Sequence, residues 1–173
     1  MDDLKQKIRH VPDFPKPGIL FYDITTLLRD PGGVRAAVDA LAAPVAGERI
    51  DLVAGVESRG FIFAASLAER FGAGFVPIRK PGKLPARCVS VEYTLEYGSG
   101  VLQMHEDAVA PGQRVLIVDD LLATGGTARA ACDLVTRCGG VVVAAGFLVE
   151  LTFLNGRDRL TDQRVYSVLA YED

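Results

Sequence analysis

The sequence lacks a long apolar run, a secretory signal and an excess of positive charge. A membrane-spanning helix needs about 20 consecutive apolar residues, and no such stretch is present. The first residues, MDDLKQKIRH, have no apolar centre and so do not predict secretion. The formal net charge is −3, which gives no support to nucleic-acid binding. These absences argue against a membrane protein, a secreted protein and a nucleic-acid-binding protein.

Cysteine and histidine are also scarce. The three cysteines, Cys88, Cys132 and Cys138, include no CxxC pair, and their odd number argues against a disulfide framework. The two histidines, His10 and His105, lie far apart and show no metal-ligand spacing. We therefore expect reduced thiols, packed or solvated histidines and a cytoplasmic protein.

The length and composition are those of one ordinary globular domain. The chain has 173 residues, of which 49% are hydrophobic and 24% charged, enough to form a real core. No linker, low-complexity tract or second domain interrupts it. Residues 1–173 are therefore predicted to form a single domain.

The first third of the chain contains two helix signals. Apolar residues at helical spacing predict a short helix over residues 2–10, which Pro12 ends. Further on, Asp30 and Pro31 are typical of an N-cap followed by a proline in the first helical turn. The amphipathic segment after them predicts a helix that Pro44 ends or distorts.

Two later segments repeat one pattern of strand, polar loop, helix and strand. In the first, the apolar strand Leu52–Val56 is followed by ESRG, FIFAASLAERFG and GFVPIRK. In the second, Val115–Val118 is followed by DDLLATGG, TARAACDLVTRCGG and VVVAAGFLVEL. Glycine follows each predicted helix, as is usual at a left-handed C-terminal stop. Strands that are apolar at almost every position suit a parallel sheet buried on both faces, so the predicted class is α/β.

The segment between these two units differs from them in composition and in its pattern of apolar residues. It begins as a basic stretch broken by proline and then alternates apolar and polar residues, with GSG as a turn signal. Such a pattern predicts a hairpin or a mobile flap. The apolar positions that share one face are Val89, Val91, Tyr93, Leu95 and Tyr97.

The stretch VLIVDDLLATGGT, from Val115 to Thr127, has the features of an anion site. Ligands of open α/β sheets bind outside the carboxyl ends of the strands. The TGGT segment offers backbone N–H groups, two hydroxyls and the positive end of a helix dipole, and its glycines permit close approach. A phosphate is favoured. Neither the GxxxxGK[ST] nor the GxGxxG spacing is present.

Asp119 and Asp120 directly precede this loop and would repel a phosphate that they faced. An ionised carboxylate only accepts hydrogen bonds, so a ribose diol or a divalent cation suits it better. A phosphorylated ribose has both parts, with the diol on the aspartates and the 5-phosphate in the loop. The alternative is a tight turn in which the aspartates merely cap a glycine-rich helix start.

At this point the residues resemble a known family. VLIVDDLLATGGT resembles the 5-phosphoribosyl 1-diphosphate (PRPP) motif of the type I phosphoribosyltransferases. PDFPKPGILFYDIT, ESRGFIF, IRKPGKLP, YTLEYG and VELTFLNGR then resemble the adenine phosphoribosyltransferases, in the same order and over nearly the whole chain. The resemblance implies a doubly wound, mostly parallel sheet with flanking helices. It also implies a small hood at residues 1–30, which binds the base, and a flexible flap at residues 80–104.

The resemblance further implies a reaction and its requirements. Adenine and PRPP would form AMP and diphosphate in purine salvage. Mg²⁺ would be bound mainly through the diphosphate and water, with no direct protein ligand. The family is typically homodimeric. In this family the 5-phosphate would be held by Ala123, Thr124, Gly125, Gly126 and Thr127, and the ribose diol by Asp119 and Asp120.

The ESRG loop and the basic run after it are the candidate diphosphate site. Arginine offers a fork of donors suited to phosphate oxygens, although a surface salt bridge or a solvated basic face is the plainer alternative. By resemblance, one or more basic residues reach the partner's site in a dimer. The residues concerned are Glu57, Ser58, Arg59, Arg79, Lys80, Lys83 and Arg87.

Two further groups complete the expected site. Adenine needs a flat apolar surface, and the resemblance places Leu20, Phe21 and Tyr22 around it with Arg59 close by, although a core aromatic is the alternative for Phe21. Some relatives carry arginine in place of Tyr22. In the flap, Glu96 is the expected acid or base and Tyr97 an expected PRPP contact, because a lid excludes water from a reacting sugar. Glu92 and Glu106 are the rivals of Glu96.

Two other functions remain open at this point. One is a phosphoribosyltransferase for another base, such as guanine or xanthine. The other is a non-catalytic regulator that senses PRPP and binds nucleic acid or a protein. The balance of 19 basic against 22 acidic residues and the absence of a spare segment disfavour the regulator.

Overall fold

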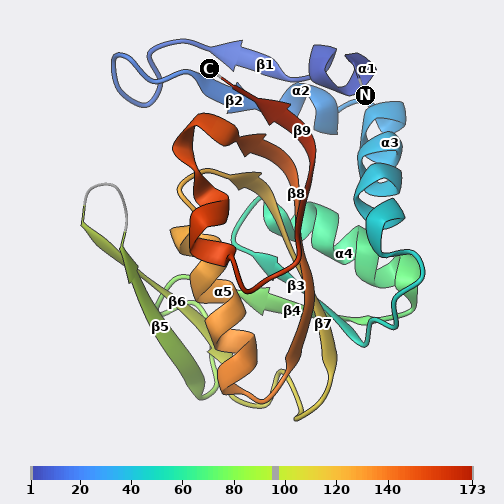
Figure 1. Cartoon of the computed structure of the whole chain (residues 1–173), viewed down its shortest axis with the longest axis vertical. Coiled ribbons are helices and arrows are strands. Elements are labelled where there is room, and N and C mark those ends of the chain that lie inside the picture. The colour runs from blue at the N-terminus through green and yellow to red at the C-terminus, as the bar shows by residue number, and fades with distance from the viewer. Residues whose placement is uncertain (1, 95–97, 173) are drawn as a thin grey trace.

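The centre of the molecule is a five-stranded parallel sheet with the strand order β4-β3-β7-β8-β9 (Figure 1). The structure is a computed structural model that describes residues 2–94 and 98–172. The expected α/β class is confirmed. The strands are β3 (Leu52–Val56), β4 (Gly74–Ile78), β7 (Arg114–Leu122), β8 (Val141–Leu151) and β9 (Val165–Tyr171).

The sheet is covered on both faces, which explains why its strands are apolar at almost every position. Helices α3 (Pro31–Ala42) and α4 (Gly60–Phe71) pack into one buried cluster, which includes Val53 and Leu116 of the sheet. Helix α5 (Gly126–Arg137) packs into a second cluster, which includes the alternate sheet residue Ile117. The doubly wound arrangement is therefore confirmed.

The strand order creates a crevice at one point of the sheet. From β3 the chain passes through α4 to β4 on one side, and then returns to place β7 on the other side of β3. The connections that leave β3 and β7 thus run in opposite directions. Ligands of such sheets bind outside the carboxyl ends of the strands at this switch point.

The amino-terminal segment forms a small layer across the carboxyl end of the sheet (Figure 1). It contains α1 (Asp2–Gln6), β1 (Arg9–Val11), β2 (Phe21–Asp23) and α2 (Thr25–Leu28). The predicted helix over residues 2–10 is wrong in its second half, because residues 9–11 pair antiparallel with β2. Arg9 Nε also donates to Asp23 Oδ2 at 2.9 Å, and this contact favours the strand.

The predicted helix boundaries in α3 are confirmed. The Asp30 side chain accepts a hydrogen bond from the Gly32 N–H at 3.0 Å, and Pro31 occupies the first helical position. The helix ends at Ala42, and a 3₁₀ turn that contains Pro44 follows it (Ala43–Val45). None of the helices in residues 2–94 and 98–172 is long and apolar enough to cross a bilayer.

The predicted hairpin is present and is formed by β5 (Cys88–Thr94) and β6 (Ser99–His105). It packs against α5. Ser99 and Gly100 of the expected GSG turn belong to β6 instead, where they pair with Thr94 and Tyr93. Two 3₁₀ helices, Thr152–Leu154 and Gly156–Leu160, connect β8 to β9. The second of these turns lies against the glycine-rich loop before α5.

Candidate active site

A pocket of about 660 Å³ lies at the carboxyl ends of β3 and β7, at the switch point of the sheet. The turn after β3 and the end of β7 form its floor, and the hairpin forms one wall. It brings together most of the residues expected to bind PRPP. Those that line it are Glu57, Ser58, Arg59, Lys80, Asp119, Asp120, Ala123, Thr124, Gly125, Gly126 and Thr127.

The two aspartates lie within a strand, not in a loop as the sequence suggested. Strand β7 continues to Leu122 because its second half pairs with β8, with Asp119 opposite Phe147. Asp120 is only 6% exposed. Asp119 Oδ1 accepts the main-chain N–H of Asp120 at 2.8 Å. Both carboxylates are therefore held by a rigid element at the pocket floor.

Gly60 explains how the two βα turns come so close together. A Cβ built on Gly60 would lie 2.7 Å from Asp119 Oδ1 and 3.0 Å from the Val118 carbonyl oxygen. Any side chain here would force the start of α4 away from β7. The glycine of ESRG thus places the amino end of α4 against the Asp119 carboxylate.

Arg59 connects the aspartates to the candidate base site. Its Nε lies 2.8 Å from Asp120 Oδ2, and its guanidinium carbon lies 5.2 Å from the centre of the Phe21 ring. A flat cation over an aromatic face is an attractive contact. The plain alternative of a surface salt bridge does not describe this arginine, because its partner is a buried carboxylate inside the pocket.

The charges on the pocket floor are only partly balanced. Burial, and then the adjacent Asp120 carboxylate, raise the pKa of Asp119 well above its usual range. Burial also raises the pKa of Asp120, although Arg59 acts in the opposite direction. Two carboxylates thus share one arginine, and the site favours a ligand that donates hydrogen bonds or carries positive charge.

The glycine-rich loop has the shape expected of an anion cradle. Gly125 has φ of +81° and caps α5, a helix of 12 residues. This left-handed conformation is open to glycine with little strain. Within the described part of the chain, the hydroxyls of Thr124 and Thr127 have no protein hydrogen-bond partner. Helix amides and two hydroxyls are therefore available to one anion.

Glu57 accepts hydrogen bonds from three of the four residues of the basic run. Its carboxylate accepts from Lys83 Nζ at 2.8 Å, from the Lys80 N–H at 3.0 Å and from Arg79 Nη2 at 3.3 Å. Its bond with Lys83, helped by the other two, lowers the pKa of Glu57 to about 2. Arg79, Lys83 and Arg87 do not line the pocket, whereas Lys80 does. Lys80 is thus the member of the run closest to the role expected of it.

Of the expected adenine residues, Arg59 lines the pocket, whereas Leu20, Phe21 and Tyr22 lie in the amino-terminal layer and do not line it. Leu20 is 41% exposed, and Phe21 contacts Phe14 edge to face at 5.1 Å. The Tyr22 ring is buried against His10 and Tyr171. A contact between Tyr22 and a base would therefore use its main chain.

The flap residues Glu96 and Tyr97 lie outside the described residues, so their roles stay predictions. Their rivals are described: Glu92 is exposed on β5, and Glu106 is exposed just after β6. Neither lines the pocket.

Sequence reasoning missed the supporting roles of Glu150 and Gly156. Glu150 is a buried acid at the end of β8, and Gly156 contacts the glycine-rich loop. The signal available was a single acid that ends a long apolar run, followed closely by the pair Asn155 and Gly156.

Comparisons with known proteins agree with this geometry. The profile of the phosphoribosyl transferase domain matches residues 26–169. The adenine phosphoribosyltransferase of Solibacter usitatus is 60% identical over 172 residues, which cover 99% of each chain. The crystal structure of the adenine phosphoribosyltransferase from Thermoanaerobacter pseudethanolicus is 52% identical, with a TM-score of 0.96 and coverage of 98% of this chain and 99% of that one.

A third relative was solved with ligands. The Saccharomyces cerevisiae adenine phosphoribosyltransferase, in complex with an imino-altritol bisphosphate and adenine, is 41% identical, with a TM-score of 0.92 and 97% of both chains covered. The domain match covers most of the chain, and these relatives are at least 41% identical to it. Both findings identify the same family. The chain belongs to the phosphoribosyl transferase family.

Proposed function

We propose that this protein is an adenine phosphoribosyltransferase, which converts adenine and PRPP into AMP and diphosphate. The observation that carries the proposal is the pocket at the switch point. It combines two buried aspartates, one arginine and a glycine-rich helix start in about 660 Å³. The three relatives described above, which share this fold and at least 41% of the sequence, carry that name.

The phosphoribosyl group is bound at two points. The N–H groups and hydroxyls of residues 123–127 hold the 5-phosphate at the amino end of α5. Asp119 and Asp120 accept hydrogen bonds from the ribose diol. As the bond from C1′ to the diphosphate oxygen breaks, positive charge develops on the sugar ring, and the same carboxylates stabilise it.

The leaving diphosphate is neutralised by groups at the other βα turn. Arg59, which is bonded to Asp120 and lines the pocket, would donate to diphosphate oxygens. Lys80 and Ser58 also line the pocket. Arg79 and Lys83 act through Glu57, which holds the basic segment in place.

Adenine N9 forms the new bond to C1′, and its proton must pass to an acceptor. Phe21, next to the Arg59 guanidinium, offers a flat surface for the purine, and main-chain groups near Leu20 and Tyr22 read its edge. We assign the proton to Glu96 by family resemblance. No covalent protein intermediate is needed, because catalysis comes from positioning of the two substrates and electrostatic stabilisation of the transition state.

Mg²⁺ fits this site as a partner of the diphosphate. No cluster of three or more potential ligand side chains occurs in residues 2–94 and 98–172, and the pocket offers the two aspartates, which suit an ion that retains water and phosphate oxygens. When bound, Mg²⁺ would neutralise part of the charge on the departing diphosphate. Asp119 and Asp120 would contact it through water.

We also propose that the protein is a cytoplasmic homodimer. Ile62 on α4 and Phe75 on β4 are large apolar side chains that are 42% and 39% exposed, and α4 begins at the pocket. A second copy that covers these residues would lie close to the ESRG turn. Light scattering coupled to size exclusion tests the oligomeric state, and a monomer at assay concentration would refute it.

The test of the reaction is an assay with PRPP, Mg²⁺ and, in parallel, adenine, guanine, hypoxanthine and xanthine. We expect turnover with adenine, and a drop in turnover of about 10²–10⁴-fold for Glu96→Gln. Glu92→Gln is the matched control and should remain active. Turnover with an oxopurine alone would keep the PRPP site and refute the adenine assignment.

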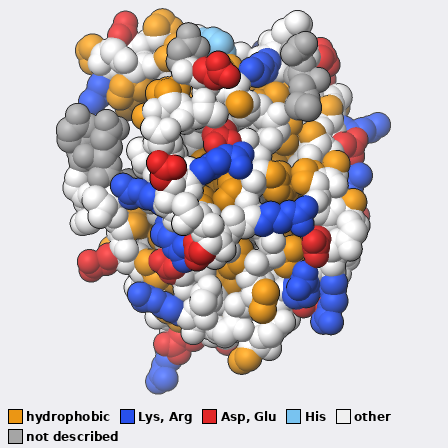
Figure 2. Space-filling model, in the orientation of Figure 1, with side chains coloured by type: hydrophobic (Ala, Val, Ile, Leu, Met, Phe, Trp, Pro, Cys, Tyr) orange, Lys and Arg blue, Asp and Glu red, His pale blue; other side chains and the backbone are white. Residues whose placement is uncertain are grey.

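The regulator alternative has a separate test. On the face shown in Figure 2, acidic and basic side chains are interspersed, which does not favour a nucleic-acid-binding surface. Clear PRPP binding without turnover on any base, together with a gel shift that survives moderate salt, would favour the regulator.

A further inference from the structure

The glycine-rich loop rests on a second element outside the pocket, the 3₁₀ turn that begins at Gly156. A Cβ built on Gly156 would lie 2.2 Å from the Ala123 carbonyl oxygen and 3.1 Å from the Gly125 nitrogen. A Cβ built on Gly125 would lie 2.2 Å from the Gly156 carbonyl oxygen. Side chains at either position would overlap backbone atoms, so the two main chains are in direct contact.

Arg157, the next residue, fixes this turn to the sheet. Its Nε and Nη2 donate to the two carboxylate oxygens of Glu150, each at 2.7 Å, and its Nη1 donates to the Val165 carbonyl oxygen at 3.0 Å. The Ser167 hydroxyl also donates to Glu150. Glu150 is only 4% exposed, and its bond with Arg157 lowers its pKa. The pair therefore stays ionised at neutral pH.

Glu150 lies beside the strand that leads into the loop. In the sheet register it is opposite Leu122, and Ala123 follows Leu122 directly. The loop is thus held from β7 at its start and from Gly156 along its length, and the Glu150–Arg157 pair connects the two supports. Neither Glu150, Gly156 nor Arg157 lines the pocket.

We propose that Glu150, Gly156 and Arg157 are positioning residues for recognition of the 5-phosphate of the substrate. They set the place of the loop whose N–H groups bind this phosphate, without touching it themselves. This inference rests on the proposed function. An ion pair with one buried and one half-exposed partner adds little net stability on average, because the lost hydration of the buried charge offsets the attraction. Its fixed bidentate geometry suits the holding of a loop better.

The experiment compares the binding of AMP and adenosine, which differ only in the 5′-phosphate, by calorimetry. For Gly156→Ala and Arg157→Lys we expect AMP affinity to fall about tenfold or more, the effect of one lost hydrogen bond to a charged group. Adenosine affinity should change less than about twofold. In kinetics, KM for PRPP should rise more than kcat falls. Glu150→Gln, which keeps a neutral acceptor, should show a smaller loss.

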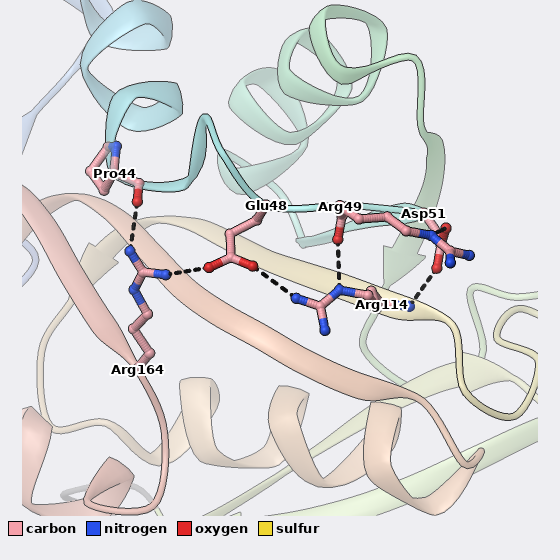
Figure 3. Close-up of polar contacts among 6 residues, drawn as sticks. All are labelled: Pro44, Glu48, Arg49, Asp51, Arg114 and Arg164. Atoms are coloured by element: carbon pink, nitrogen blue, oxygen red, sulfur yellow. Dashed lines mark hydrogen bonds and ion pairs between the residues drawn. The ribbon is translucent and has the colours of Figure 1, made fainter.

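The matched control is Arg164→Gln, which removes an arginine from the Glu48 pair at the other end of the sheet (Figure 3). It should leave the ratio of the two affinities unchanged. If Gly156→Ala does not fold, Arg157→Lys decides. Folded variants that keep the wild-type ratio would overturn the positioning role. A wild-type protein that binds AMP no better than adenosine would instead refute the proposed function.

Discussion

At the amino end of the sheet, one carboxylate binds two arginines, whereas at the carboxyl end two carboxylates share one. Glu48 contacts Arg114 Nη2 at 2.8 Å and Arg164 Nη1 at 2.9 Å, and Arg164 Nη2 also donates to the Pro44 carbonyl oxygen at 2.6 Å (Figure 3). Asp119 and Asp120 line the pocket together with Arg59, whose Nε lies 2.8 Å from Asp120 Oδ2.

The difference shows in the acids themselves. Asp51, at the amino end, accepts from the Arg114 N–H at 2.8 Å and from Arg49 Nε at 3.0 Å, and these bonds lower its pKa. Asp119 and Asp120 have raised pKa values because burial destabilises their charged forms more than Arg59 and the neighbouring N–H groups stabilise them. The amino end is thus complete without a ligand. The carboxyl end is left incomplete, and a substrate that donates hydrogen bonds completes it.

The strongest test of this contrast is Asp119→Asn. A raised pKa means that the folded protein holds the proton more tightly than the unfolded chain, so stability falls as pH rises from the usual value to the raised one. Removal of the charge should therefore raise the Tm near neutral pH. The kcat should fall about 10²–10³-fold, as for the loss of one group that stabilises transition-state charge. Thermal unfolding from pH 5 to 8 and steady-state kinetics measure both effects.

Asp51→Asn is the matched control at the amino end, and it should change stability in the opposite direction. A carboxylate whose pKa is lowered by folding stabilises the protein. This stabilisation is fully present above the usual pKa and is lost as the pH falls through the lowered pKa. This variant should have a lower Tm at neutral pH and unchanged kinetics. If Asp119→Asn also lowers the Tm at neutral pH, the two ends of the sheet do not differ as described.

The second test removes the arginine that is paired with Asp120 on the pocket floor. Arg59→Gln should lower kcat/KM about 10–100-fold, the equivalent of one hydrogen bond to a charged group. It should also move the acidic limb of the pH profile to higher pH, because Arg59 lowers the pKa of Asp120. Arg49→Gln, which changes an exposed arginine at the amino end, should alter neither. A limb that does not move would show that Arg59 does not influence Asp120 in the free protein.

The third test adds one methyl group at each end. Gly60→Ala places a Cβ 2.7 Å from Asp119 Oδ1, and overpacking of this kind costs about 1–3 kcal/mol. Since the start of α4 must shift, kcat/KM should fall as well. At Gly47, near Glu48, a Cβ would meet nothing within 4 Å, so Gly47→Ala should be neutral or stabilise by up to about 1 kcal/mol. Urea unfolding measures both, and equal effects would refute the argument from close packing.

The fold follows from the sequence where the local pattern and the tertiary structure agree. The apolar strands, the Asp30 cap and the hairpin are such cases, because each depends on periodicity or on a turn signal. The strand at Arg9–Val11 could not be predicted in this way, since it depends on its pairing with residues 21–23. A strand of three residues is too short to show a clear alternation of apolar and polar residues, so the helical spacing of the apolar residues before it decided the prediction.

The site was predictable in its motifs and less so in its contacts. The glycine-rich loop, the aspartates and ESRG all meet in one pocket. The extension of β7 through Asp119 required its pairing with β8, and the role of Glu57 required the approach of Lys83. Contacts between distant segments leave no periodic trace. For the same reason the contact of Gly125 with Gly156 was not visible in advance.

The smallest effect is expected from the pair shown in Figure 3. Arg164→Gln should lower the free energy of unfolding by about 0.2–1 kcal/mol, the range of solvent-exposed ion pairs, because half of its side chain is exposed and Glu48 keeps Arg114 as a partner. For a chain of this size, each kcal/mol corresponds to about 2–4 °C in Tm. The loss should shrink further in high salt, which screens exposed charges, and KM for PRPP should not change. A loss well above this range, with unchanged KM, would mean that the amino-end residues act as one cooperative network. A changed KM would mean that the two ends of the sheet are coupled, and the separation of stability from ligand binding would fail.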